Sequence, residues 1–212
     1  MDEQPRIKIV LIGESGVGKT NLIQVAMGNP FQEDIDSTIS SSYYEGDIII
    51  NNKQYLYSLW DTAGQEAYRS LNKLFIKESK IVLVVFAINS RQSFEQTDFW
   101  FNYTKEILGE NNYIIALVGN KSDLYMEQQI PEEEIKKKAD ELKIKMKITS
   151  ALEDAVSFKE FLDELIKDFV HTFGIKLENK KTFALKSEKD VEVEEGEDNN
   201  GKGKKKKKKK CC

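Results

Sequence analysis

Residues 7–20, IKIVLIGESGVGKT, decide the fold of this 212-residue chain. The apolar, β-branched run 7–12 predicts a buried strand, and 13–20 fits the pattern GxxxxGK[ST], which follows a strand, opens a helix and binds phosphate. Glycines let successive backbone amides curl around phosphate oxygens, and the helix N-terminus adds a favourable dipole. A chance glycine-rich turn would give these four fixed positions in on the order of one such chain in a hundred, so phosphate binding is the stronger interpretation.

The rest of the chain alternates strand-like and helix-like stretches. Two further apolar runs, 81–86 and 113–119, are near-continuous, which is typical of strands covered on both faces in a parallel sheet. The pattern also predicts a hairpin (43–50 and 54–60, with a polar turn at 51–53), a short last strand (146–149) and helices (20–28, 92–108, one starting at Pro131, and 155–173). Apolar side chains at helical spacing from Val156 to Phe173 predict a core-facing stripe. Together these elements predict a doubly wound α/β sheet with ligands at the carboxyl ends of its strands.

Charge and cysteine content exclude several classes of protein. The net charge of −4 is a sum over unlike regions, because 188–198 (EKDVEVEEGED) holds seven acids and 202–210 (KGKKKKKKK) holds eight lysines. The two cysteines are Cys211 and Cys212, so we expect no disulfide framework, which is typical of a reducing compartment. With a single histidine, His171, we expect no structural zinc site. No apolar run approaches the length of a transmembrane helix, and the body is expected to be cytosolic.

The glycine-rich loop predicts specific contacts with a nucleotide. Lys19 is expected to reach the β and γ phosphates, and the hydroxyl of Thr20 is expected to ligate Mg²⁺. The candidate nucleotide-binding residues here are Glu14, Ser15, Gly16, Val17, Gly18, Lys19, Thr20 and Asn21.

A second motif selects the base. Residues 120–123, NKSD, follow the strand 113–119 and match the guanine-selective pattern NKxD. A carboxylate at Asp123 can accept from the ring N–H and from the exocyclic amine of guanine, whereas adenine would leave the acid unmatched. Alone, NKSD would be taken as an ordinary turn, but its combination with the upstream phosphate loop favours GTP. Asn120, Lys121 and Asp123, with Ser150, Ala151 and Leu152 after the last strand, are the candidate base-binding residues.

A third motif carries the reaction. DTAGQE, at 61–66, follows the strand that ends at Trp60. Asp61 is expected to hold Mg²⁺ through water, the amide of Gly64 to sense the γ-phosphate, and Gln65 to orient the attacking water.

The five motifs GESGVGKT, Thr38, WDTAGQE, NKSD and TSA, in this order and spacing, resemble the Ras superfamily of small GTPases over about residues 6–175. The resemblance implies a P-loop NTPase small G domain, a six-stranded, mostly parallel sheet with helices on both faces. It implies that Phe31 flanks the guanine ring and that Thr38 ligates Mg²⁺ in the GTP state. Gln65, Lys19 and Thr38 would be the catalytic residues, and GTP or GDP with Mg²⁺ the ligands.

Within the superfamily the chain most resembles the Rab family. Ser15 fits GxSGVGK, the stretch 68–71 (YRSL) is similar to the Rab ERFRSL, and a Cys-Cys end is a Rab-type geranylgeranyl acceptor. There are departures: 38–43 reads TISSSY where Rabs have TIGVDF, and Ala67 and Leu152 replace an arginine and a lysine. Leu152 still offers apolar cover for the base. The serines at 40–42 alter the effector region.

The predicted organisation is an N-terminal extension (1–5), a G domain (6–176) and a disordered hypervariable tail (177–212) with acidic stretch, lysine run and Cys211-Cys212. A lysine run is ordinarily a solvated end or a nucleic-acid patch. Adjacent terminal cysteines favour a lipid anchor instead, because two signals together hold stably on a membrane. We expect a lipid-anchored monomer on the cytoplasmic face of endomembranes or the plasma membrane, with a cytosolic pool. The resemblance implies an exchange factor, a GTPase-activating protein, a GDI or escort protein and effectors as partners.

Several functions compete. The leading one is a GTP/GDP switch in Rab-type vesicle trafficking that hydrolyses GTP slowly, on the order of 10⁻⁴ per second without an activating protein. The alternatives are a nucleotide-binding scaffold with little hydrolysis, a Ras-type signalling GTPase, and a basic-tailed nucleic-acid binder. Gln65 and Thr38 disfavour the scaffold, and the acidic body disfavours nucleic acid.

Overall fold

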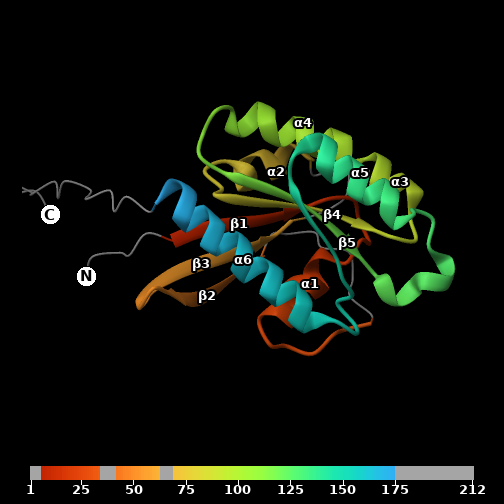
Figure 1. Ribbon diagram of the computed structural model, residues 1–212, viewed down its shortest axis with the longest axis horizontal. Coiled ribbons are helices and arrows are strands. Elements are labelled where there is room, and N and C mark those ends of the chain that lie inside the picture. The colour runs from red at the N-terminus through yellow and green to blue at the C-terminus, as the bar shows by residue number, and fades with distance from the viewer. Residues whose placement is uncertain (1–5, 34–41, 63–68, 175–212) are drawn as a thin grey trace, which may run out of the picture. The chain divides into compact units, whose positions relative to one another are not determined.

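The computed structural model describes residues 6–33, 42–62 and 69–174, and within them one sheet has six strands in the order β2-β3-β1-β4-β5-β6 (Figure 1). The strands are β1 (Arg6–Ile12), β2 (Ser42–Ile50), β3 (Lys53–Asp61), β4 (Ile81–Ala87), β5 (Ile114–Asn120) and β6 (Lys145–Ile148). β2 runs antiparallel to β3, and every other neighbouring pair is parallel. The predicted α/β fold class, a mostly parallel six-stranded sheet, is confirmed.

The helices are α1 (Lys19–Ala26), α2 (Arg69–Ile76), α3 (Arg91–Glu95), α4 (Thr97–Leu108), α5 (Glu132–Leu142) and α6 (Ala155–Phe173), with a 3₁₀ helix, η2 (Ser122–Glu127). Alternate residues of the central strands feed two cores. Ile9 and Leu11 face α1 and α6, while Val10 and Ile12 face the layer of α2 to α5 (Figure 1). Strands buried on both faces explain why their sequences lack alternation.

The sequence prediction differs from the structure in the helices. The single helix expected over 92–108 is broken between α3 and α4 at Gln96, beside Thr97, whose hydroxyl donates to the carbonyl of Phe94 at 2.6 Å. A hydroxyl that bonds to a nearby helix carbonyl often bends a helix. α2 and η2 were not predicted. Val156 was expected in the core-facing stripe of α6, but it is 69% exposed, because it lies on the opposite side of the helix from the buried Phe158.

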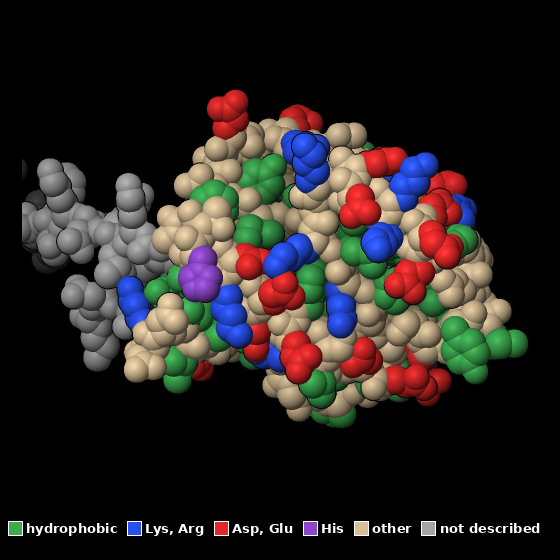
Figure 2. Space-filling view, viewed as in Figure 1, with side chains coloured by type: hydrophobic (Ala, Val, Ile, Leu, Met, Phe, Trp, Pro, Cys, Tyr) green, Lys and Arg blue, Asp and Glu red, His purple; other side chains and the backbone are tan. Residues whose placement is uncertain are grey.

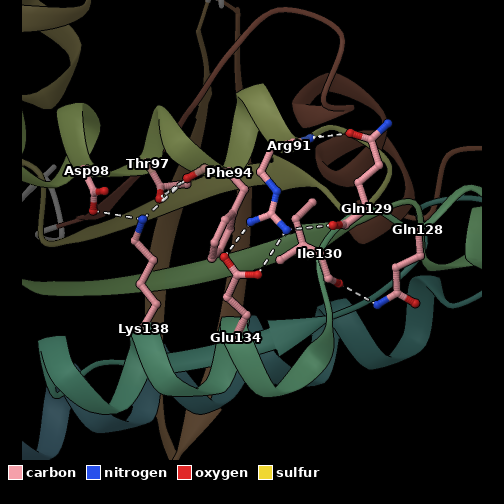
Figure 3. Close-up of polar contacts among 9 residues, drawn as sticks. All are labelled: Arg91, Phe94, Thr97, Asp98, Gln128, Gln129, Ile130, Glu134 and Lys138. Atoms are coloured by element: carbon pink, nitrogen blue, oxygen red, sulfur yellow. Dashed lines mark hydrogen bonds and ion pairs between the residues drawn. The ribbon is translucent and has the colours of Figure 1, made fainter.

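Polar contacts fasten α5 to α3 and α4 (Figure 3). The guanidinium of Arg91 donates to both carboxylate oxygens of Glu134, at 2.5 and 3.0 Å, and to the carbonyl of Gln129 at 2.8 Å. The ammonium of Lys138 lies 2.9 Å from Asp98 and 4.6 Å from the centre of the Phe94 ring. The hydrogen bond from Arg91 lowers the pKa of the Glu134 carboxyl. These contacts join helices of one layer.

In the part of the chain that the structure describes, no helix is long and apolar enough to span a bilayer.

Candidate nucleotide site

The loop between β1 and α1 passes over the carboxyl end of β4. Gly13 has a φ of 146°, and a Cβ at this position would lie 2.1 Å from the carbonyl oxygen of Val85. Gly18, with a φ of 92°, is the N-cap of α1, and its Cβ would lie 2.3 Å from the side-chain nitrogen of Asn120. A side chain at either glycine would fill the space in which the loop meets the sheet and the 120–123 loop. The sequence therefore needs glycine at both positions for the loop to curl.

Lys19 is the first residue of α1, and its side chain reaches back into this loop. Its side chain is only 5% exposed, and its ammonium donates to the carbonyls of Gly13 and Glu14 at 2.9 and 2.8 Å. Burial lowers the pKa of Lys19 to about 8, and the nearby Asp61 and Glu14 oppose the shift. An ammonium has three hydrogens to donate, so one beyond these two bonds can be given to an anion in the loop.

Two oxygen-bearing side chains meet beside Lys19. The hydroxyl of Thr20 donates to a carboxylate oxygen of Asp61 at 2.8 Å, and Asp61 is 2% exposed. The next residue, Thr62, donates its hydroxyl to the carbonyl of Leu11 at 2.7 Å, which ties the end of β3 to β1. Hydroxyl and carboxylate oxygens are the ligands that Mg²⁺ prefers, so this pair fits a magnesium ion. When bound, such an ion neutralises charge on the phosphates.

Asn120, at the end of β5, joins three loops. Its side-chain amide donates to the carbonyl of Val17 at 2.8 Å and accepts from the backbone N–H of Ala151 at 3.1 Å. It is 1% exposed. One side chain therefore links the 13–20 loop to the 120–123 and 149–151 segments.

Asp123 is held by the loop that follows β6. The hydroxyl of Ser150 donates to one carboxylate oxygen of Asp123 at 2.5 Å, and accepts from the backbone N–H groups of Leu152 and Glu153 at 3.1 and 3.0 Å. Lys121 precedes η2 with a left-handed φ of 67°. These hydrogen bonds orient the carboxylate of Asp123.

The remaining candidates are placed less centrally. Phe31 is half-buried against the core that α1 and α6 cover, and the side chain of Leu152 is 54% exposed. The side-chain amide of Asn21 forms two hydrogen bonds with the backbone of Gln32, and contact of Asn21 with a nucleotide stays a prediction. Thr38, Gly64, Gln65, Cys211 and Cys212 lie outside the residues that the structure describes.

The structure brings the described candidates together in two groups: Lys19, Thr20 and Asp61 at the loop, and Asn120, Asp123, Ser150 and Ala151 beyond it. Val17 was a nucleotide-binding candidate from the sequence, but the bond that its carbonyl accepts from Asn120 was not predicted, nor was the bond between Thr62 and Leu11. No local pattern could have revealed them, because these bonds depend on strand pairing and join residues far apart in the chain.

Three aromatic side chains that the sequence analysis did not single out are in contact on β2, β3 and α2. The ring centres of Tyr43 and Trp60 are 5.3 Å apart, and those of Trp60 and Phe75 are 5.8 Å apart. Tyr43 is 56% exposed and Leu74 of α2 is 66% exposed. We call Tyr43, Trp60 and Phe75 the aromatic surface, and Leu74 adjoins Phe75 in the chain. An exposed group of this kind is typical of a protein interaction site.

Comparison with known proteins agrees with this geometry. A sequence model of the Ras family matches residues 8–171. The chain is also 35% identical over 169 residues to the Ras-related protein Rab-11C of Dictyostelium discoideum, an alignment that covers 80% of this chain and 75% of that relative.

Proposed function

Because the chain belongs to the Ras family of small GTPases, we propose that it is a Rab-type switch, which binds GTP with Mg²⁺, hydrolyses it, and acts on membranes of vesicle trafficking. The GTPase activity itself follows from family membership. The finer assignment rests on this chain's own residues. The observation that supports the guanine-nucleotide site is the pair of hydrogen bonds from Asn120 to Val17 and Ala151, which join residues 13–20 to the NKSD motif and to the 149–151 segment.

In the proposed site, Lys19 and the amides of 14–20 bind phosphate, and Thr20, Asp61 and Thr38 hold Mg²⁺. Asn120, Lys121, Asp123, Ser150, Ala151, Leu152 and Phe31 surround the base. Gln65 orients the attacking water, and Gly64 contacts the γ-phosphate. The buried ammonium of Lys19, 2.8 Å from the Glu14 carbonyl, supports the phosphate assignment.

Base selectivity tests the guanine assignment. In Asp123→Asn, the side-chain oxygen still accepts from Ser150, so the loop keeps its shape. The variant replaces one of the two oxygens that accept from guanine by an NH₂ group, which can donate to the carbonyl of xanthine. We expect GTP affinity to fall at least roughly 100-fold and XTP affinity to rise. Competition among GTP, ATP and XTP measures this, and undiminished GTP binding would refute the guanine assignment.

Hydrolysis separates the switch from a scaffold that merely binds nucleotide. Gln65→Leu should keep GTP affinity and reduce turnover stimulated by an activating protein, because the side chain positions water and contributes little to ground-state binding. Single-turnover phosphate release is the measurement. Equal rates in parent and variant would show that another group places the water.

Effector binding is proposed at the aromatic surface. Tyr43 directly follows the segment 34–42 that contains Thr38, and Trp60 directly precedes Asp61, so this surface adjoins the chain on both sides of the proposed γ-phosphate contacts. Capture from a lysate with protein loaded with GDP or with a non-hydrolysable GTP analogue tests this. Partners retained by the GTP form alone should be lost in Tyr43→Ala and kept in Tyr55→Ala.

The membrane assignment rests on the tail sequence. A prenyl chain buries many methylenes in the bilayer at about 0.8 kcal/mol each. The attraction between the lysines and anionic lipids, by contrast, is screened within about 8 Å at physiological salt. Cys211→Ser with Cys212→Ser should therefore release the protein from membranes. Replacing the lysines at 204–210 by glutamine should weaken membrane binding or redistribute the protein among membranes. Cell fractionation with mass spectrometry of the C-terminal peptide is the test. A double serine variant that remains in the membrane pellet would contradict the proposal.

A nucleic-acid role is disfavoured by the surface charges. On the face shown in Figure 2, acidic and basic side chains are interspersed rather than gathered by sign. A Ras-type signalling role remains the closer alternative, and the nature of the partners that the GTP form retains distinguishes it from trafficking.

A further inference from the structure

Asn21, in the first turn of α1, forms a reciprocal pair with the backbone of Gln32. Its side-chain nitrogen donates to the Gln32 carbonyl at 2.8 Å, and its side-chain oxygen accepts from the Gln32 N–H at 3.1 Å. Both functional groups of the amide are therefore engaged with one residue of the segment that leaves α1. Asn21 lies two residues after Lys19, which places this contact next to the phosphate loop.

Gln24 lies one turn further on the same side of α1, since residues three apart are neighbours on a helix. Its side-chain oxygen accepts from the amide of Asn29 at 2.8 Å, and its side-chain nitrogen donates to the hydroxyl of Tyr44 at 2.8 Å. The backbone N–H of Asn29 also donates to the Gln24 carbonyl at 2.9 Å. The segment 29–32 is thus fastened to α1 at both of its ends, and Phe31 lies between them.

These amides are not needed to pack the core. The buried residues of α1 are Lys19, Leu22, Ile23 and Ala26, whereas Asn21 and Gln24 are only partly buried. Their hydrogen bonds instead determine the path of the chain that carries Phe31. A segment that is already held in one conformation loses less conformational entropy when a ligand binds against it.

We propose that Asn21 and Gln24 are positioning residues that hold Phe31 against the guanine base and so set the rate of nucleotide release. This inference rests on the proposed guanine site and on the assigned role of Phe31. It gives Asn21 a role other than direct contact of its side chain with nucleotide. Tyr44 couples the same helix face to β2.

The test is the release rate of a fluorescent GDP derivative from the full-length protein, in Mg²⁺ and excess unlabelled GDP. Phe31→Leu should accelerate release. Asn21→Leu should accelerate release about three- to tenfold, since one net hydrogen bond corresponds to about a tenfold change in an equilibrium constant. Gln24→Leu should have a similar effect. Gln24→Glu should restore slow release, because a carboxylate can accept from both the Asn29 amide and the Tyr44 hydroxyl.

A double variant shows whether Asn21 acts through Phe31. If it does, Asn21→Leu with Phe31→Leu should release GDP no faster than Phe31→Leu alone, because coupled residues are non-additive. Gln54→Leu is the matched control: Gln54 also donates a side-chain amide, to Asp47 at 3.1 Å on the β2–β3 hairpin, remote from the site. The Gln54→Leu variant should release GDP at the same rate as the parent protein. Should Asn21→Leu not fold, Asn21→Ser takes its place in the cycle.

The outcomes are distinct. Accelerated release in Phe31→Leu with unchanged release in Asn21→Leu would overturn the inference and leave the guanine site standing. Additive effects in the double variant would overturn it as well, because they would show that Asn21 acts independently of Phe31. A parent protein that retains no GDP would overturn both the inference and the proposed site.

Discussion

Lys19 illustrates how one residue combines structural cost with function. Its ammonium is almost fully buried and lies between two backbone carbonyls, 2.9 and 2.8 Å away. Burial disfavours the charged form, which lowers the pKa to about 8. A bound phosphate would favour the charged form again, because attraction to its negative charge would compensate for the hydration that the ammonium loses on burial.

This shift predicts a pH dependence of nucleotide affinity. Free protein loses the Lys19 proton as the pH rises above about 8, whereas nucleotide-bound protein keeps it. The contribution of Lys19 to affinity is therefore complete below this pH and is lost above it, by at most about tenfold per pH unit. Titration calorimetry with GDP from pH 7 to pH 9 measures this.

The matched variant is Lys19→Ala, which should bind more weakly and show a flatter profile over the same pH range. If parent and variant lose affinity in parallel as the pH rises, another group is responsible for the titration.

Among the elements, the unit β1–loop–α1 carries the strictest backbone requirements. β1 is paired with β3 on one side and β4 on the other, so the loop that follows it must leave the sheet over a neighbouring strand. Gly13 makes this exit against the Val85 carbonyl, and Gly18 starts α1 against Asn120. Gly16, at the outer side of the same loop, has no atom within 4 Å of where its Cβ would lie.

These surroundings predict losses of stability of different size for two alanine substitutions. Gly13→Ala places a methyl group 2.1 Å from a backbone oxygen, which cannot move without disturbing β4, and should destabilise the protein by at least about 3 kcal/mol. Gly16→Ala meets open space, and with a φ of 75° should cost only about 1–2 kcal/mol. Urea unfolding of both variants compares them. Equal losses of stability would show that close contact with Val85 is not what requires Gly13.

In the molecule as a whole, the site is assembled from segments distributed along the chain. The phosphate loop follows β1, Asp61 ends β3, Asn120 ends β5, and Ser150 follows β6. The parallel strands place all these ends at one edge of the sheet. A ligand that contacts every segment stabilises the whole sheet rather than one loop.

Nucleotide and metal removal should therefore lower global stability. A ligand present at about 1,000 times its dissociation constant adds about 4 kcal/mol, which corresponds to a shift in Tm of about 10 °C for a domain of this size. Calorimetry of protein stripped with chelator and phosphatase, against protein in Mg²⁺ and GDP, measures the shift. ATP is the control ligand and should give no shift; an equal shift with ATP would contradict guanine selectivity.

Local chemistry allowed the sequence alone to determine much of this protein. Residues 7–20 define a strand, a loop and a helix start within one short stretch, because glycine positions and continuous apolar character are local properties. The same holds for the buried strands β4 and β5, whose two-sided burial produces unbroken apolar runs. The motifs at 61–66 and 120–123 were recognisable because each is contiguous.

Other features depended on tertiary structure. The bond from Asn120 to Val17 spans 103 residues, and that from Ser150 to Asp123 spans 27. The aromatic surface combines residues from β2, β3 and α2, and the exposure of Val156 depends on which side of α6 faces the sheet. The hydrogen bonds follow from strand order, because β1 and β6 bring distant strand ends together with those of β4 and β5, and the exposure of Val156 follows from the packing of α6. Contacts between such ends are a property of the assembled sheet, and no local pattern in the chain contains them.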